Sequence, residues 1–205
     1  MDSDDRAHRV GRLRAVTEHE LDDAQRRLWD LVVDGPRGSA AWMVANGVLA
    51  GPFNAWLQVP EIGKALAEAG ERLRFSSQLD PIMRELVILT VGAHWRSEFE
   101  FWAHSGIATA EGMSTDLIEA IATVDSAAVN QYGGATNGAV YELVRALLEQ
   151  GHPSEEQIMR VCELIGESAA VEAVTLAGYY TTVSFTLNAF DVPLPAGVAH
   201  RWSLS

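Results

Sequence analysis

The stretch that most constrains the fold is residues 79–112, LDPIMRELVILTVGAHWRSEFEFWAHSGIATAEG, which predicts two consecutive helices. Asp80 is a good N-cap and Pro81 a good first residue for the first helix. Apolar residues then occupy almost every face over residues 82–93, which is typical of a buried helix. Glu85 interrupts this run. An unpaired buried carboxylate costs several kcal/mol, so Glu85 needs a partner or a proton.

A second helix is predicted to begin near Ser97, and it carries two further ionisable residues. Glu100 and His104 are four residues apart and therefore lie on one face of that helix. The helical hairpin would bring both of them toward Glu85. Three ionisable groups in apolar surroundings are typical of sites whose pKa values are adjusted for chemistry near neutral pH. We therefore predict Glu85, Glu100 and His104 as catalytic residues.

Glu100 and His104 also have purely structural interpretations. Ser97 and Glu100 match the S-x-x-E capping box, in which the carboxylate accepts a hydrogen bond from the Ser97 backbone N–H. His104 could instead be a core histidine that is hydrogen-bonded to a backbone carbonyl. Ser97 as a nucleophile is disfavoured because no G-x-S-x-G context surrounds it.

Glu85 likewise has an alternative role, because a neighbouring arginine, Arg84 or Arg72, could neutralise it. Carboxylates and imidazoles also suit zinc or iron. A metal site would combine Glu85, Glu100, His94 and His104. His94 precedes a turn and its direction does not follow from the sequence, so we favour a site without metal.

Side chains of two kinds would hold a substrate beside this site. Arginine offers a bidentate fork to a carboxylate, and aromatic rings can line a pocket for a flat molecule, although aromatics at helical spacing more often belong to the core. The predicted substrate-binding residues are Arg84, His94, Trp95, Arg96, Trp102 and Tyr180.

The rest of the chain predicts an all-α fold, since alternating β-branched runs are nearly absent. A Thr17-x-x-Glu20 capping box should open a helix that ends before residue 35. Residues 130–138, NQYGGATNG, predict a loop because Gly and Asn cluster there. Further helices are expected over residues 60–73, 113–124, 141–150, 158–165 and 172–190.

The expected organisation is one helical domain at residues 16–195, between a loose N-terminal arm at residues 1–15 and a C-terminal arm at residues 196–205. Two segments of the chain are weakly similar to each other: ELVIL, which begins at Glu85, and EAVTL, which begins at Glu172. This similarity suggests an internal duplication whose second copy lacks the histidine and the second glutamate. Function would then reside in the first copy.

Composition excludes several classes of protein. The 205 residues are 48% hydrophobic, enough for one well-filled core. The formal net charge of -13 disfavours binding to nucleic acid or to anionic membranes, which requires clustered Lys and Arg. The single cysteine, Cys162, excludes an intrachain disulfide and a CxxC redox pair. The charged N-terminus and the lack of a long apolar run favour a cytoplasmic protein.

Several strings in this sequence resemble the carboxymuconolactone decarboxylase family, a part of the AhpD-like all-helical superfamily. They are GPFNAWLQVPEIG at residues 51–63, R-E-L-x-I-L at 84–89, F-E-F-W-x-H at 99–104, G-M-S at 112–114 and TLAGYYTTVSFTLNAFDVPLP at 175–195. The resemblance covers roughly residues 50–195. It implies an AhpD-like helical bundle, a homotrimer or hexamer, and no metal or organic cofactor.

The resemblance also bears on the chemistry. In the peroxidase branch, a Glu at the position of Glu85 is followed by cysteines at the positions of Ser97 and Glu100 and by a His at that of His104. Both thiols are missing here, and a peroxidase of this type needs a thiolate and a resolving thiol. The decarboxylase branch also lacks the pair and often has Glu at the position of Glu100.

The leading hypothesis is therefore a cofactor-free lyase or isomerase that acts on a small unsaturated lactone or oxo-acid by general acid–base catalysis. One alternative is a non-enzymatic helical oligomer that binds a small aromatic or acyl ligand in the same place. A residual peroxidase or other oxidoreductase is the third, and it would have to depend on Cys162.

Overall fold

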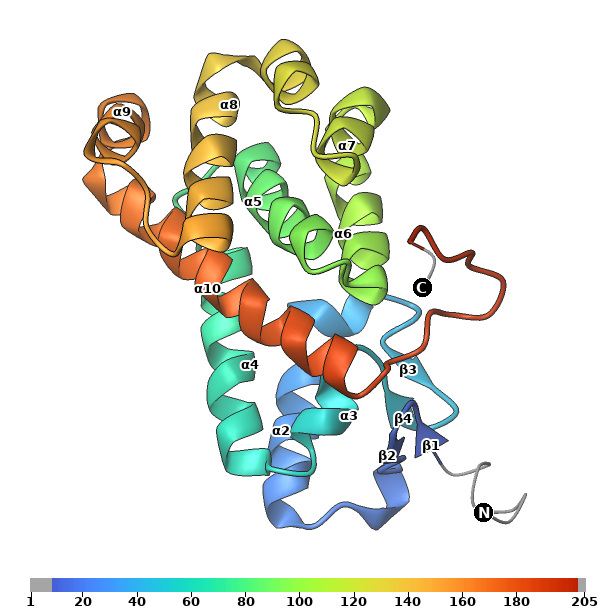
Figure 1. Ribbon diagram of the computed structural model, residues 1–205. Coiled ribbons are helices and arrows are strands. Elements are labelled where there is room, and N and C mark those ends of the chain that lie inside the picture. The colour runs from blue at the N-terminus through green and yellow to red at the C-terminus, as the bar shows by residue number, and fades with distance from the viewer. Residues whose placement is uncertain (1–8, 203–205) are drawn as a thin grey trace. The chain divides into compact units, whose positions relative to one another are not determined.

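The computed structural model describes residues 9–202, and over these residues the fold is helical, with only two short hairpins (Figure 1). The predicted all-α class is confirmed. The described residues form two compact units, one from residues 9–76 together with residues 186–202, the other from residues 77–185. The single domain predicted for residues 16–195 includes parts of both units, and the internal duplication stays a prediction.

The first unit is organised around two packed helices, α2 (Asp23–Val33) and α4 (Pro60–Phe75). At Gly63 of α4 an added Cβ would lie 2.6 Å from the Trp56 carbonyl oxygen and 2.9 Å from Leu28 Cδ2, so only glycine permits this close approach. The smaller elements are η1 (Glu18–Glu20), η2 (Pro36–Ser39), α3 (Phe53–Trp56), and the strands β3 (Val44–Ala45) and β4 (Val48–Leu49), which pair antiparallel.

The N-terminal end of this unit differs from the expectation in two ways. The Thr17–Glu20 capping box is present, but it closes only the 3₁₀ turn η1. The α-helix begins one turn later, behind a second capping box of Asp22 and Gln25. In the expected loose arm at residues 1–15, β1 (Arg9–Val10) and β2 (Leu13–Arg14) form a hairpin, and residues 1–8 lie outside the described residues.

The second unit surrounds α5 (Pro81–His94) with other helices. Asp80 caps α5 as predicted, because the Met83 N–H donates to Asp80 Oδ1 at 3.0 Å. Residues 85–93 of α5 are all buried. The helices around it are α6 (Glu98–Ala110), α7 (Thr115–Ala122) and α8 (Ser126–Gln150), while α9 (Glu155–Ile165) packs on α8. The last helix, α10 (Glu167–Ala189), lies in this unit as far as Phe185.

The predicted loop at residues 130–138 is wrong, because α8 continues through this stretch. Its only non-helical residue inside is Gly134, at φ 76° and ψ 170°, where the helix is kinked. The Asn130 and Asn137 side-chain amides donate to carbonyls one turn earlier in the same helix, at 2.9 and 3.0 Å. Burial of Val129 and Gly138 on either side of the kink outweighs the turn propensity of Gly and Asn.

The C-terminal arm expected at residues 196–205 contains turns and bends but no helix or strand over residues 196–202, and residues 203–205 lie outside the description. Among the described helices, none combines the length and the apolar character that crossing a membrane requires.

Candidate active site

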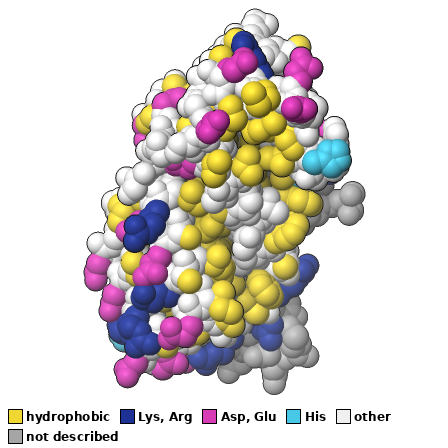
Figure 2. Space-filling model, turned by 90° about the vertical axis from the view of Figure 1, so that its left-hand side faces the viewer, with side chains coloured by type: hydrophobic (Ala, Val, Ile, Leu, Met, Phe, Trp, Pro, Cys, Tyr) yellow, Lys and Arg dark blue, Asp and Glu magenta, His cyan; other side chains and the backbone are white. Residues whose placement is uncertain are grey.

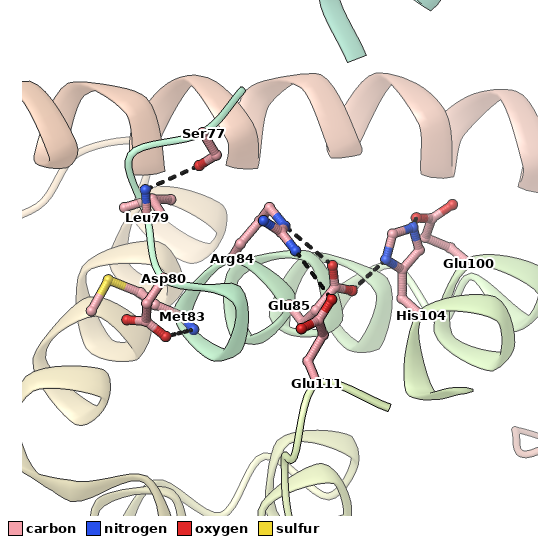
Figure 3. Close-up of polar contacts among 9 residues, drawn as sticks. All are labelled: Ser77, Leu79, Asp80, Met83, Arg84, Glu85, Glu100, His104 and Glu111. Carbon is pink, nitrogen blue, oxygen red and sulfur yellow. Dashed lines mark hydrogen bonds and ion pairs between the residues drawn. The ribbon is translucent and has the colours of Figure 1, made fainter. Parts of the chain in front are cut away.

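The three predicted catalytic residues meet in the antiparallel hairpin of α5 and α6. Glu85 comes from the second turn of α5, while Glu100 and His104 face one way from α6 (Figure 3). The turn between the helices is tight: Arg96 has φ 47°, and the Ser97 N–H donates to the Gly92 carbonyl at 2.9 Å.

His104 lies between two carboxylates. Its Nδ1 is 2.6 Å from Glu85 Oε2, with hydrogen-bond geometry, and its Nε2 is 3.0 Å from Glu100 Oε1, within ion-pair distance. All three residues are buried, with exposed fractions of 0% for Glu85, 4% for Glu100 and 5% for His104. Neither ring nitrogen is used for a backbone carbonyl, so the interpretation of His104 as a carbonyl-bonded core histidine is wrong.

The surroundings of His104 favour its protonated form. Burial by itself lowers the pKa of His104, but the negative charges of Glu85 and Glu100, and the contacts with both, raise its pKa above the ordinary value. Only the imidazolium has an N–H on each side of the ring, and so a donor toward each carboxylate. The buried carboxylates therefore favour the protonated form of His104 in surroundings that exclude most of the solvent.

Arg84 completes the charge balance of the cluster. Its Nε lies 3.4 Å from Glu85 Oε1, and a terminal nitrogen lies 3.9 Å from Glu111 Oε1 (Figure 3). The predicted pairing of Glu85 with an arginine is thus confirmed for Arg84, in addition to His104. Counting an ionised Arg84 and His104 against Glu85 and Glu100, the buried cluster is formally neutral, as a buried set of charges must nearly be.

Sequence reasoning missed Glu111. It is the exposed C-cap residue of α6, and it reaches Arg84 because the end of α6 returns to the beginning of α5. No local motif marks it. The antiparallel hairpin itself was the only available signal, since it places the C-terminal end of α6 beside Arg84.

The capping-box interpretation of Glu100 is wrong. Ser97 is the N-cap residue of α6 but makes no side-chain cap hydrogen bond, and its N–H donates to Gly92 rather than to a carboxylate. The Glu100 carboxylate is turned to His104 instead. Glu100 therefore contacts the candidate site and does not cap α6.

Tyr180 brings α10 to the site. Its ring is 97% buried and meets the His104 ring edge to face, with centroids 5.1 Å apart and an interplanar angle of 82°. Such a contact presents the electron-rich face of one ring to the polarised edge of the other. Tyr180 therefore restricts the orientation of the imidazole on the side that the carboxylates leave open.

The other predicted substrate-binding residues occupy different places. His94 and Trp95 pack on each other at 4.6 Å at the end of α5, and Trp95 also packs on Phe185 at 4.6 Å. Trp102 packs on Phe99 at 5.6 Å, and Arg96 is exposed in the turn before α6. Their role in substrate binding stays a prediction. Among residues 9–202, no group of three or more His, Cys, Asp and Glu side chains is arranged to hold a metal ion.

Comparison with family models matches part of the chain, and the matched part includes the candidate site residues. Residues 60–145 match the carboxymuconolactone decarboxylase family. The resemblance inferred from the sequence motifs is thus confirmed from the start of α4 to the last third of α8, a segment that includes Glu85, Glu100 and His104. A search of curated proteins gave no match.

The matched segment contains the three residues of the candidate site, and their geometry indicates what they can do. Within the segment that matches this family, a buried histidine lies between two glutamates, one of which also contacts an arginine, and its pKa is raised. Such a cluster can donate a proton, accept one, and stabilise negative charge that develops nearby.

Proposed function

We propose that the protein is a cofactor-independent lyase or isomerase that acts on a small unsaturated lactone or oxo-acid. The observation that carries the proposal is the position of His104, buried between Glu85 and Glu100 at 2.6 and 3.0 Å with its pKa raised. General acid catalysis near neutral pH requires a group that still holds its proton there.

The reaction can proceed on side chains alone. A carboxylate on the γ-carbon of an unsaturated lactone leaves as CO2, and the electron pair of the broken C–C bond moves into the ring toward the carbonyl oxygen. The resulting dienolate accepts one proton on carbon, which restores the neutral lactone. An isomerisation uses the same dienolate but begins with removal of a proton instead of loss of CO2.

The described residues fit three parts of this reaction: proton delivery, orientation of the acid, and desolvation of the substrate carboxylate. His104 delivers the proton, and the ion pair with Glu85 keeps it on the ring until the dienolate forms. Glu100 contacts the opposite ring nitrogen of His104, and its negative charge balances that of the imidazolium. The buried surroundings favour loss of a substrate carboxylate, because desolvation disfavours its charge.

The proposal is tested with Glu85→Gln and His104→Gln, both close in shape to the native residues. Purified protein is incubated with a panel of unsaturated γ-lactones and oxo-acids, and products are followed by mass spectrometry and by CO2 release. We expect turnover in the wild type and at least a hundredfold loss in both variants, roughly the contribution of one acid–base group.

Glu163→Gln is the matched control, since Glu163 is an exposed carboxylate on α9. It should retain wild-type turnover. Circular dichroism at 25 °C must show unchanged helicity in every variant. Full activity in both Glu85→Gln and His104→Gln would refute the proposed acid–base role.

The aromatic ring of Tyr180 beside His104 supports a second candidate, a helical oligomer that binds a small aromatic or acyl ligand without converting it. Thermal-shift measurements with the same compounds separate the two. Stabilisation by a compound that is recovered unchanged supports the binding protein, whereas product formation supports the enzyme. A homotrimer or hexamer stays a prediction in either case.

A further inference from the structure

The outward face of α10 carries an exposed stripe with no ionisable residue. Exposed positions recur at alternating spacings of four and three residues, as in the contact seam of paired helices. They are Val171, Thr175, Gly178, Thr182 and Phe185, which we call the α10 stripe. Its ends are large apolar side chains: Val171 is 67% exposed and Phe185 is 50% exposed.

The two threonines of the α10 stripe add little polarity. The Thr175 hydroxyl donates to the Val171 carbonyl at 2.8 Å, and the Thr182 hydroxyl donates to the Gly178 carbonyl at 3.4 Å. Because both hydroxyls are satisfied within α10, a partner helix can cover them without leaving a buried donor unpaired. Hydrophobic side chains are also exposed together on the face of the molecule shown in Figure 2.

The order of residues in the α10 stripe is symmetric about its centre. Reading outward from Gly178 in either direction gives a threonine and then a large apolar residue. An antiparallel copy of the same helix would therefore set Gly178 against Gly178, Thr175 against Thr182, and Val171 against Phe185. A two-fold contact requires this kind of self-complementary surface.

Gly178 allows the helices to approach closely at the crossing point. A Cβ built there would meet nothing within 4 Å in the chain itself, so packing inside one subunit does not require glycine at this position. Small residues at a helix crossing let two backbones come together. The contact with Trp95 meanwhile holds Phe185 in place on the surface.

The symmetric order of the α10 stripe points to a second copy as its occupant, and the local charge permits this contact. The chain carries a net charge of -13, so contact between two copies is least opposed where neither surface carries charge. From residue 173 to residue 190 the sequence contains no Asp, Glu, Lys, Arg or His. We infer that the α10 stripe binds the α10 stripe of a second copy of this chain, antiparallel, about a two-fold axis at Gly178.

The inference refines the oligomer that the family resemblance implies. A hexamer can form a two-fold contact in every subunit, whereas a trimer cannot. The inner side of the same helix carries Tyr180 against His104, so the contact would lie directly behind the candidate active site.

Cysteine cross-linking tests the contact. Gly178→Cys is made in a Cys162→Ser background, which removes the only native cysteine. A disulfide forms only when the two Cα atoms lie within about 7 Å. We expect mild oxidation to give a covalent pair at about twice the 22.3 kDa chain mass, reversed by a thiol. Gly106→Cys is the matched control, since Gly106 is also an exposed helical glycine with nothing within 4 Å of its built Cβ.

Two further measurements complete the test. Val171→Cys mixed with Phe185→Cys, in the same background, should cross-link more than either variant alone, and the opposite order would refute the antiparallel arrangement. Gly178→Glu should halve the mass measured by light scattering, while Gly106→Glu should leave it unchanged. A monomeric wild type, equal cross-linking at both glycines, or an unchanged mass in Gly178→Glu would overturn the inference.

Discussion

Replacing Glu85 by glutamine should measure how strongly the buried charges hold the α5–α6 hairpin together. Glu85 is 0% exposed and contacts His104 at 2.6 Å, so the variant removes a charge from a pair that solvent barely screens. Two unit charges about 4 Å apart attract by about 4 kcal/mol at an effective dielectric constant of about 20. The glutamine oxygen can still accept from His104, which retains about 1 kcal/mol.

The expected net loss is therefore about 3 kcal/mol in the free energy of unfolding, at the low end of the range for breaking a buried ion pair. For a chain of this size the loss corresponds to a fall of roughly 6–12 °C in the melting temperature. Urea unfolding followed by circular dichroism gives the free energy directly, with the exposed Glu163→Gln as the control expected to change by less than about 0.5 kcal/mol.

The pH dependence of this loss follows from the raised pKa of His104. A raised pKa in the folded state stabilises the protein fully below the unfolded-state value near 6.5, and the stabilisation disappears as pH rises through the folded-state pKa. The difference between wild type and Glu85→Gln should accordingly be largest at about pH 6 and shrink at higher pH. A loss below about 1 kcal/mol at pH 6, or one that grows with pH, would refute a charged Glu85–His104 pair.

Two other substitutions test packing and capping by the same urea unfolding. Gly63→Ala places a Cβ 2.6 Å from the Trp56 carbonyl oxygen and should cost about 1–3 kcal/mol; no loss would mean that α3 and α4 do not approach as closely as described. Ser97→Ala should be neutral or slightly stabilising, because the buried hydroxyl has no hydrogen-bond partner among residues 9–202 and makes no cap bond. A loss of about 1 kcal/mol would instead restore the capping role.

The sequence was most informative where local rules and burial agree. Asp80 and Pro81 locate the start of α5, and the continuous apolar run predicts its burial. The four-residue spacing of Glu100 and His104 places both on one face of α6. Once α5 and α6 were expected to form a hairpin, the approach of that face to Glu85 could be predicted.

It was least informative where two local motifs compete for the same atoms. In the sequence, the Glu100 carboxylate has two possible partners: the Ser97 backbone N–H, in a capping box, and the His104 side chain. In the structure it contacts His104, because an imidazolium is a stronger hydrogen-bond donor to a carboxylate than a neutral backbone N–H. At residues 130–138 the turn propensity of Gly and Asn is local, whereas the burial that keeps α8 helical comes from other elements.

The polar links between α5 and α6 also favour one register of the two helices. The tight turn at Arg96 fixes the end of the hairpin where α5 passes into α6. Further from the turn, two links join the helices: Glu85 to His104, and Arg84 to Glu111. His104 and Glu111 are seven residues apart, or about 10 Å along the helix, so a shift of one helical turn of about 5.4 Å would break both links. The turn and the polar links thus favour the same alignment of α5 and α6, in a hairpin whose first helix is apolar on almost every face.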